Sequence, residues 1–130
     1  MRTASCPCGQ LTLQCEGDPI RVSACHCRAC QRRSGSAFAL QARWPEDAVA
    51  LQGEWNTWSR VGDSGNTATF RFCPACGTTV AFTSTYMPGF IAVPVGTFAD
   101  PGFPPPRISV YEESMHPWLA IAGDDVEHFS

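Results

Sequence analysis

Residues 66–84 read NTATFRFCPACGTTVAFTS, two alternating segments that meet at a pair of cysteines. Apolar and polar residues alternate before and after this pair, which is the pattern of β-strands with one buried face. Between the segments, Cys73 and Cys76 have the spacing of a zinc knuckle, and Gly77 tolerates the positive φ that such a turn needs. The stretch therefore predicts two strands joined by a metal-binding loop.

A second stretch of the same build, CPCG, lies at residues 6–9. Both stretches have proline after the first cysteine and glycine after the second. Two matching knuckles would supply four thiolates, which complete the tetrahedral shell of Zn²⁺ and leave no open position. We therefore predict one closed, structural zinc site with the ligands Cys6, Cys8, Cys73 and Cys76.

The third cluster, ACHCRACQRRSG at residues 24–35, has neither proline nor glycine beside its cysteines. It offers three thiols, Cys25, Cys27 and Cys30, and no clustered ligand remains for a fourth position. Three protein ligands with one open position are typical of catalytic zinc. We therefore prefer a second zinc ion whose fourth position belongs to water or substrate.

Four other residues could complete this trio and turn it into a second structural site. Cys15 stands in a strand-like segment without a turn to aim its sulfur, and we expect it to be a small buried residue. His26 would point away from its neighbouring cysteines in extended backbone, so we expect a hydrogen-bonding neighbour of a ligand or a surface histidine. His116 and His128 are remote in sequence and stay open as ligands.

The chain predicts a mostly β, single domain over residues 1–130. Its 130 residues are 44% hydrophobic, and eleven glycines and eleven prolines interrupt it every few residues. We expect strands within 10–17, 20–25, 36–44, 48–53, 66–73, 78–84, 90–98 and 107–114, with a helical turn as the alternative at 36–40. One short helix is expected at 27–33. The proline-rich residues 100–107 are expected to form a surface loop, and the tail at 123–130 to fray.

The bulk composition excludes several classes of protein. A formal charge of −3 and an isoelectric point near 5.5 argue against nucleic-acid binding. No apolar run is long enough to cross a membrane, and the first residues lack the apolar core of a secretory signal. We therefore expect a cytoplasmic protein, in which reduced cysteines bind metal rather than form disulfides.

All nine basic side chains are arginines, whose planar guanidinium suits bidentate binding of carboxylates. Arg28, Arg32 and Arg33 lie beside the cysteines of the trio, and we expect at least one of them to bind a substrate carboxylate. The alternative for each is a solvated surface charge.

Four stretches together resemble the glutathione-dependent formaldehyde-activating enzyme family, which also includes centromere protein V. They are SCPCG, CHCRACQRRSGSAF, FCPACGTTVAF and VGTFADPGFPPPRISVYEESMHPW, which span the chain from Cys6 to Trp118. The resemblance implies a β-tent, a zinc-anchored stack of antiparallel sheets, with a structural zinc on the four knuckle cysteines. It also implies a second zinc with a free position on the middle three. The chain departs from many relatives at Arg107-Ile108, where they have His-Ile, so a proton-transfer role there would be absent or fall to His116.

The resemblance implies a zinc-dependent carbon–sulfur lyase that joins glutathione, or a similar thiol, to formaldehyde and forms S-hydroxymethylglutathione reversibly. We expect two Zn²⁺ ions per chain, with the three-ligand ion the more easily lost. The expected partner is a small thiol, without nucleic acid or membrane, and exposed aromatic residues would suit a homodimer. The alternatives are a zinc-braced binding module and a methionine sulfoxide reductase-like enzyme, for which Cys15 would have to be the nucleophile.

Overall fold

The computed structural model describes all residues of the chain, 1–130. It contains eleven strands, one α-helix and three short 3₁₀ helices. The strands are β1 (Arg2–Ser5), β2 (Thr12–Cys15), β3 (Arg21–Cys25), β4 (Ala39–Pro45), β5 (Val49–Gln52), β6 (Asn56–Val61), β7 (Thr67–Phe72), β8 (Thr79–Ser84), β9 (Phe90–Pro94), β10 (Ile108–Val110) and β11 (Glu127–His128). The helices are α1 (Arg28–Ser34), η1 (Glu46–Ala48), η2 (Val95–Phe98) and η3 (Glu112–Ser114).

The strands form two sheets, which confirms the expected mostly β class. A small antiparallel sheet has the order β1-β2-β5, and a large sheet has the order β11-β10-β3-β4-β9-β8-β7-β6. The large sheet is antiparallel except at one edge, where β10 pairs in parallel with both β3 and β11. None of the helices combines the length and the apolar character needed to cross a lipid bilayer.

The hydrophobic core joins the small sheet to the middle of the large sheet. Leu11, Leu13 and Cys15 are fully buried, as the alternation of β2 and its preceding residue predicts. Trp44 of β4 is also fully buried, and its indole N–H donates to the carbonyl of Gly17 at 3.2 Å. The N-terminal knuckle cysteine Cys6 lies in the same core cluster. The core therefore fixes the loop after β1 in place.

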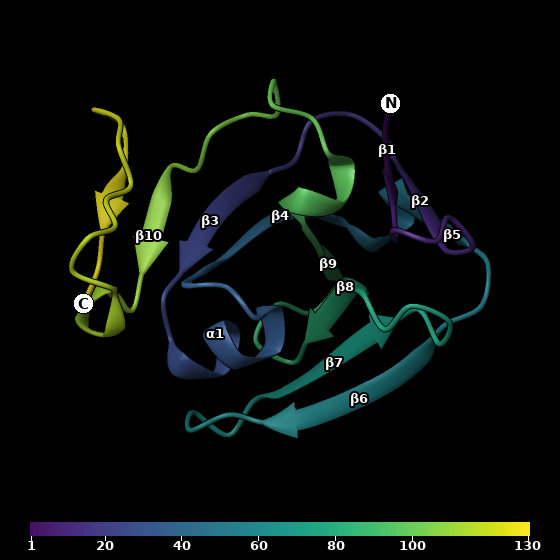
Figure 1. The fold of residues 1–130 in the computed structure, drawn as a ribbon, viewed down its shortest axis with the longest axis horizontal. Helices are drawn as coiled ribbons and strands as arrows, with labels where there is room; N and C mark the ends of the chain where they lie inside the picture. The colour runs from purple at the N-terminus through teal and green to yellow at the C-terminus, as the bar shows by residue number, and fades with distance from the viewer.

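The large sheet bends over α1, so that the helix lies between the β3 end and the β6 end of the sheet (Figure 1). The helix follows β3 directly, and its Arg33 contacts the rings of Phe70 on β7 and Phe82 on β8. Gly35 ends the helix in a left-handed conformation with φ 69°, and its N–H donates to the carbonyl of Gln31. This arrangement positions residues 25–33 inside the bend.

Several predicted element boundaries were wrong. The segment at 90–98 leaves the strand conformation after Pro94 and continues as η2, and the segment at 107–114 leaves it after Val110. Residues 36–40 contain no helical turn, because Ala39 and Leu40 already pair in β4. Strands β1 and β6 were not predicted.

The C-terminal tail was expected to fray, but it is paired. Backbone hydrogen bonds of 2.9 Å join Glu127 to Arg107, Phe129 to Ser109, and Glu112 to Phe129. These bonds make β11 the outer strand beyond β10, which a polar sequence of this length does not reveal.

Candidate metal centres

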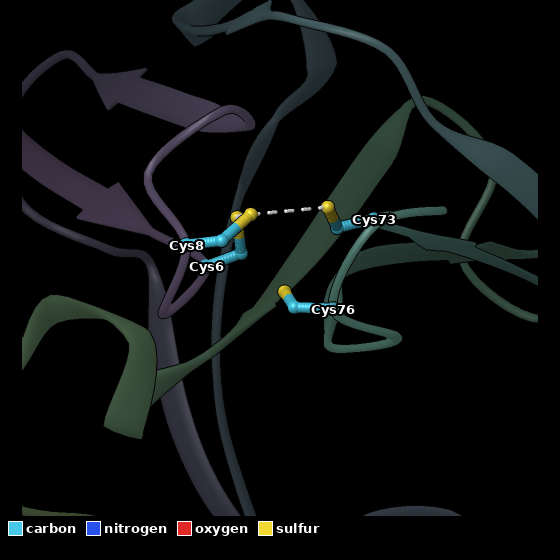
Figure 2. A group of neighbouring side chains, drawn as sticks. All are labelled: Cys6, Cys8, Cys73 and Cys76. Atoms are coloured by element: carbon cyan, nitrogen blue, oxygen red, sulfur yellow. Dashed lines mark hydrogen bonds between the residues drawn. The ribbon is translucent and has the colours of Figure 1, made fainter.

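Two loops that are far apart in the sequence bring the four knuckle cysteines together (Figure 2). Cys6 and Cys8 lie after β1, and Cys73 and Cys76 lie after β7. Their four sulfur atoms lie within 4.8 Å of one another, with Cys6 and Cys8 3.6 Å apart and Cys8 and Cys73 3.7 Å apart. A tetrahedron with Zn–S bonds of about 2.3 Å has edges of about 3.8 Å. The quartet therefore fits a metal ion in size and in donor chemistry.

Hydrogen bonds from the protein stabilise thiolates in this quartet. The backbone N–H of Leu11 donates to the sulfur of Cys6 at 3.4 Å, and the Nε2 of Gln10 donates to that of Cys73 at 3.0 Å. Backbone hydrogen bonds from Thr78 and from Cys8 lower the pKa of Cys76 to about 6. Donors aimed at sulfur are the usual surroundings of a bound thiolate. Gln10 was missed by the sequence analysis, because nothing in its sequence context marks a hydrogen-bonding role.

The second cluster contains three sulfurs and no fourth ligand. The sulfur atoms of Cys25, Cys27 and Cys30 lie within 4.8 Å of one another, and no His, Asp, Glu or further Cys joins them at that distance. The trio could hold a metal ion, with the protein filling three positions of a tetrahedral shell. The quartet and the trio therefore differ in the number of protein ligands, as the sequence predicted.

Local structure aims the three sulfurs at one point. Cys25 ends β3, Cys27 is the N-cap of α1, and Cys30 lies in the first turn of the helix. The backbone N–H of Cys30 donates to the sulfur of Cys27 at 3.3 Å, which is the hydrogen bond of an N-cap residue. Hydrogen bonds from the thiols of Cys25 and Cys30 hold the pKa of Cys27 well below its usual range, and the hydrogen bonds of Cys25 with Cys27 and with Cys30 raise the pKa of Cys25. A thiolate therefore forms readily within the trio.

His26 does not bind with the trio, and it is not a surface residue. Its side chain is fully buried, and its Nε2 lies 2.9 Å from the hydroxyl of Ser109 on β10. Burial lowers its pKa, so the ring is neutral at pH 7. Of the two expected roles, the surface role was wrong: His26 ties the backbone between two cysteines to the neighbouring strand.

The other two histidines also lie outside the trio. The Nε2 of His116 is 2.9 Å from the Oε1 of Gln31, and His128 pairs with Glu112 at 2.7 Å. Gln31 in turn donates to the carbonyl oxygens of His26 at 2.8 Å and Ser114 at 3.1 Å. Gln31 thus connects the helix, the loop of the trio and the C-terminal segment, a role that the sequence analysis missed.

The three arginines predicted near the trio have different surroundings. Arg28 and Arg32, four residues apart on one face of α1, are exposed. The guanidinium of Arg33 lies over the rings of Phe70 at 5.3 Å and Phe82 at 5.5 Å, and burial lowers its pKa while the thiolates of the trio oppose that change. Arg33 is therefore the only one of the three whose charge is held inside the bend of the sheet.

Arg60 on β6 lies within electrostatic reach of Cys27, and the sequence analysis did not single it out. Its positive charge contributes to the low pKa of Cys27 and also lowers the pKa of Arg33. No pattern close to the cysteines could have indicated it, because the large sheet brings β6 back to α1 only in the folded chain.

Other expected features lie away from the trio. Cys15 is fully buried, and burial raises its pKa to about 11. Two surface hollows of about 460 Å³ each lie near Phe103 and near Pro105, and neither is lined by a cysteine. The chemistry of the cysteines is therefore not associated with either hollow.

Known proteins show which family this arrangement belongs to. Residues 1–114 match the family described as glutathione-dependent formaldehyde-activating enzyme. A crystal structure of a Rhodobacter sphaeroides protein has a similar fold, with a TM-score of 0.60 and 21% identity over 79% of this chain and 91% of that chain. No curated protein matches the chain. Because the family match covers most of the residues, the chain belongs to the glutathione-dependent formaldehyde-activating enzyme family.

Proposed function

We propose that this chain adds the thiol of glutathione, or of a similar small thiol, to formaldehyde at the cysteine trio. The S–H group adds across the C=O bond: a carbon–sulfur bond forms, and the proton passes to the oxygen to give S-hydroxymethylglutathione. The reverse reaction breaks the same bond. The family match supports this reaction class.

The observation that carries the proposal is the difference in ligand number between the two clusters. Four sulfurs complete a tetrahedral shell, whereas the trio has no fourth protein donor within 4.8 Å. A zinc ion held by the trio would supply a positive charge that favours the thiolate form of an incoming thiol. The quartet, by contrast, has the build of a structural site.

The residues around the trio support binding of an anionic sulfur. Cys27 receives the backbone hydrogen bond of Cys30, and the guanidinium of Arg33 lies within electrostatic reach of all three cysteines. His26 and Gln31 hold the backbone on either side of Cys27 through their bonds to Ser109 and to the C-terminal segment. The chain thus provides a fixed set of donors before any substrate arrives, which lowers the ordering cost of binding.

Anaerobic metal analysis combined with turnover tests this proposal. Wild-type protein should contain two zinc ions, and Cys27→Ser should contain one. Cys27→Ser should also fail to catalyse the formation of S-hydroxymethylglutathione from ¹³C-formaldehyde and glutathione, which NMR follows. Gln14→Ala, at an exposed position on β2, is the matched control and should retain both zinc ions and the catalytic activity. A cobalt-substituted trio should change its visible spectrum when millimolar glutathione is added. A spectrum that stays fixed contradicts the glutathione proposal.

The burial of Cys15 counts against a methionine sulfoxide reductase-like activity. That chemistry needs an accessible cysteine of low pKa, whereas Cys15 is fully buried with a pKa raised to about 11. A zinc-braced binding module remains the second candidate. Two zinc ions with no spectral response to any thiol would favour it.

A further inference from the structure

Arg33 of α1 lies over the aromatic face formed by β7 and β8, Arg60 of β6 lies within electrostatic reach of Cys27, and neither has an acidic partner. The ion pairs of the chain involve Arg2 with Asp18, Arg107 with Asp125, and His128 with Glu112. Arg33 and Arg60 are in none of them, although the chain has more acidic than basic residues. Arg33 is half-buried, and its Nε is buried without an acceptor in the protein. A desolvated cation without a partner is costly, so this position favours an anion from outside the chain.

The side chains of Arg33 and Arg60 meet the same face of the large sheet. Trp58, Phe70 and Phe82 lie directly opposite one another on β6, β7 and β8, with ring centroids 5.7 Å and 5.1 Å apart. We call these three residues the aromatic row. Arg60 follows Trp58 by two positions, so its side chain leaves the same face of β6. Arg33 reaches that face from α1 and lies over two rings of the row.

The charges at this place also favour an anionic ligand. Three thiolates and a divalent ion sum to about minus one, and two guanidiniums add plus two, which leaves an excess of plus one. A bound thiolate brings that sum to zero. A carboxylate on the same ligand makes the sum minus one, so it is favoured by local pairing rather than by net charge: the planar fork of a guanidinium matches a carboxylate in two parallel hydrogen bonds.

We propose that Arg33 and Arg60 form a carboxylate-binding subsite that selects thiols carrying a carboxylate, with the sulfur at the trio and the carboxylate at the aromatic row. This inference rests on the proposed function, because it requires that a thiol binds at the trio. It goes further in naming Arg60 as a specificity-determining residue and in excluding the exposed Arg28 and Arg32 from that role.

Two thiols of nearly equal size test the subsite. Zinc-loaded protein is titrated calorimetrically with 3-mercaptopropionate and with 3-mercaptopropan-1-ol, which differ only in carboxylate against hydroxymethyl. Wild type should bind the carboxylate thiol about tenfold or more tightly than the alcohol, the scale of one charge-assisted hydrogen bond. Arg60→Gln should reduce this ratio toward one without changing the affinity for the alcohol. Added salt should reduce the wild-type ratio as well.

Arg71→Gln is the matched control, because Arg71 lies on β7 with the opposite orientation, over the ring of Trp55 at 5.6 Å. It should keep the wild-type ratio. Arg33→Lys keeps the charge but loses the planar fork, and it should give an intermediate ratio.

Three results would overturn the subsite. The wild-type protein could bind both thiols equally, or Arg60→Gln could keep the wild-type ratio. Arg60→Gln could also lose the second zinc, in which case the guanidinium serves the metal centre rather than the ligand. If neither thiol binds the wild-type protein, the proposed function itself has failed, and the subsite with it.

Discussion

The Nε2 of Gln10 lies 3.0 Å from the Sγ of Cys73 and donates a hydrogen bond to it. The same nitrogen donates to the carbonyl oxygen of Glu54 at 2.7 Å, and the Oε1 accepts from the N–H of Glu54 at 3.0 Å. One amide thus joins the knuckle at residues 6–9, the knuckle at residues 73–77 and the loop before β6. The quartet is therefore held by a hydrogen-bonded neighbour as well as by its four sulfurs.

Replacing this amide should weaken the quartet. Gln10→Ala removes all three hydrogen bonds, so the free energy of unfolding should fall by about 1–3 kcal/mol. The affinity of the quartet for zinc should fall by about tenfold to a hundredfold, as is usual when a group bonded to a metal ligand is lost. Chemical denaturation and competition with a chromophoric chelator measure the two effects. Gln14→Ala is the control, and an equal loss in that variant would contradict the role assigned to Gln10.

The two metal ions should leave in a fixed order. The trio would hold its ion with three protein ligands and the quartet with four. Anaerobic addition of a chelator should therefore remove one zinc first while the far-ultraviolet circular dichroism stays unchanged. Removal of the second should unfold the chain, because metal binding to a structural site contributes directly to the free energy of folding. Loss of both zinc ions in one step would contradict the predicted difference in affinity between the trio and the quartet.

Cys76→Ser tests the structural role of the quartet directly. It removes one quartet ligand without touching residues 24–35, and it should lower the melting temperature far more than Cys27→Ser. Equal effects of the two variants would contradict a structural role for the quartet alone.

The sequence predicted the quartet, the trio and most of the strands for identifiable physical reasons. Leu11, Leu13 and Cys15 alternate with polar residues, and all three are fully buried. The two knuckles share proline and glycine at matching positions, and the structure brings them together. Patterns that repeat over a few residues are visible in a sequence because the local backbone conformation produces them.

The features that were missed depend on contacts between distant segments. Strand β6 has mostly exposed side chains, so it lacks the alternation that marks a half-buried strand. Strand β11 has two residues and forms only because β10 offers an unpaired edge. Tertiary contacts also determine the roles of Gln10, Gln31 and Arg60. No spacing of residues in the sequence predicts such contacts.

Gln31 should stabilise the trio in the way that Gln10 stabilises the quartet. Its amide makes three hydrogen bonds, to His26, Ser114 and His116. Gln31→Ala should lower the free energy of unfolding by about 1–3 kcal/mol and should release the trio's zinc more rapidly. The exposed Arg32→Ala on the same helix is the control. If Gln31→Ala releases the trio's zinc at the wild-type rate, Gln31 stabilises the fold but not the metal site.

The C-terminal strand should loosen in acid. The hydrogen bond from His128 holds the pKa of the Glu112 carboxyl below its usual range. A carboxyl group whose pKa is lower in the folded state stabilises the fold above its unfolded pKa, and this contribution is lost as pH falls through the folded pKa. The protection factors of the amides at residues 127–129, which correct hydrogen exchange for its intrinsic pH dependence, should therefore fall below about pH 4.5. Glu112→Gln should have low protection factors at these amides at neutral pH, with little further change in acid. Wild-type protection factors that do not change with pH would contradict this assignment.

Cys15 should behave unlike the other seven cysteines. It is fully buried and belongs to neither cluster, and burial raises its pKa to about 11. After removal of the trio's zinc alone, which should leave the chain folded, iodoacetamide should label the half-buried Cys27 and Cys30 first, and Cys15 should react only as fast as the whole chain unfolds. The pH dependence has a definite sign. Between about pH 9 and pH 11, the thiol of Cys15 ionises in the unfolded chain but not in the folded one, so stability should fall as pH rises.

Cys15→Ala separates this alkaline effect from those of the metal ligands. The variant should lose about 1 kcal/mol at pH 7, the scale of one buried heavy atom. Its stability should then decline less steeply than that of wild type between pH 9 and pH 11, since the ionisable group is gone. Mass spectrometry of the labelled peptides and urea denaturation at each pH provide the two measurements. If Cys15 is labelled as rapidly as Cys27 after removal of the trio's zinc alone, its thiol is accessible in the folded protein, and a nucleophilic role for Cys15 is again possible.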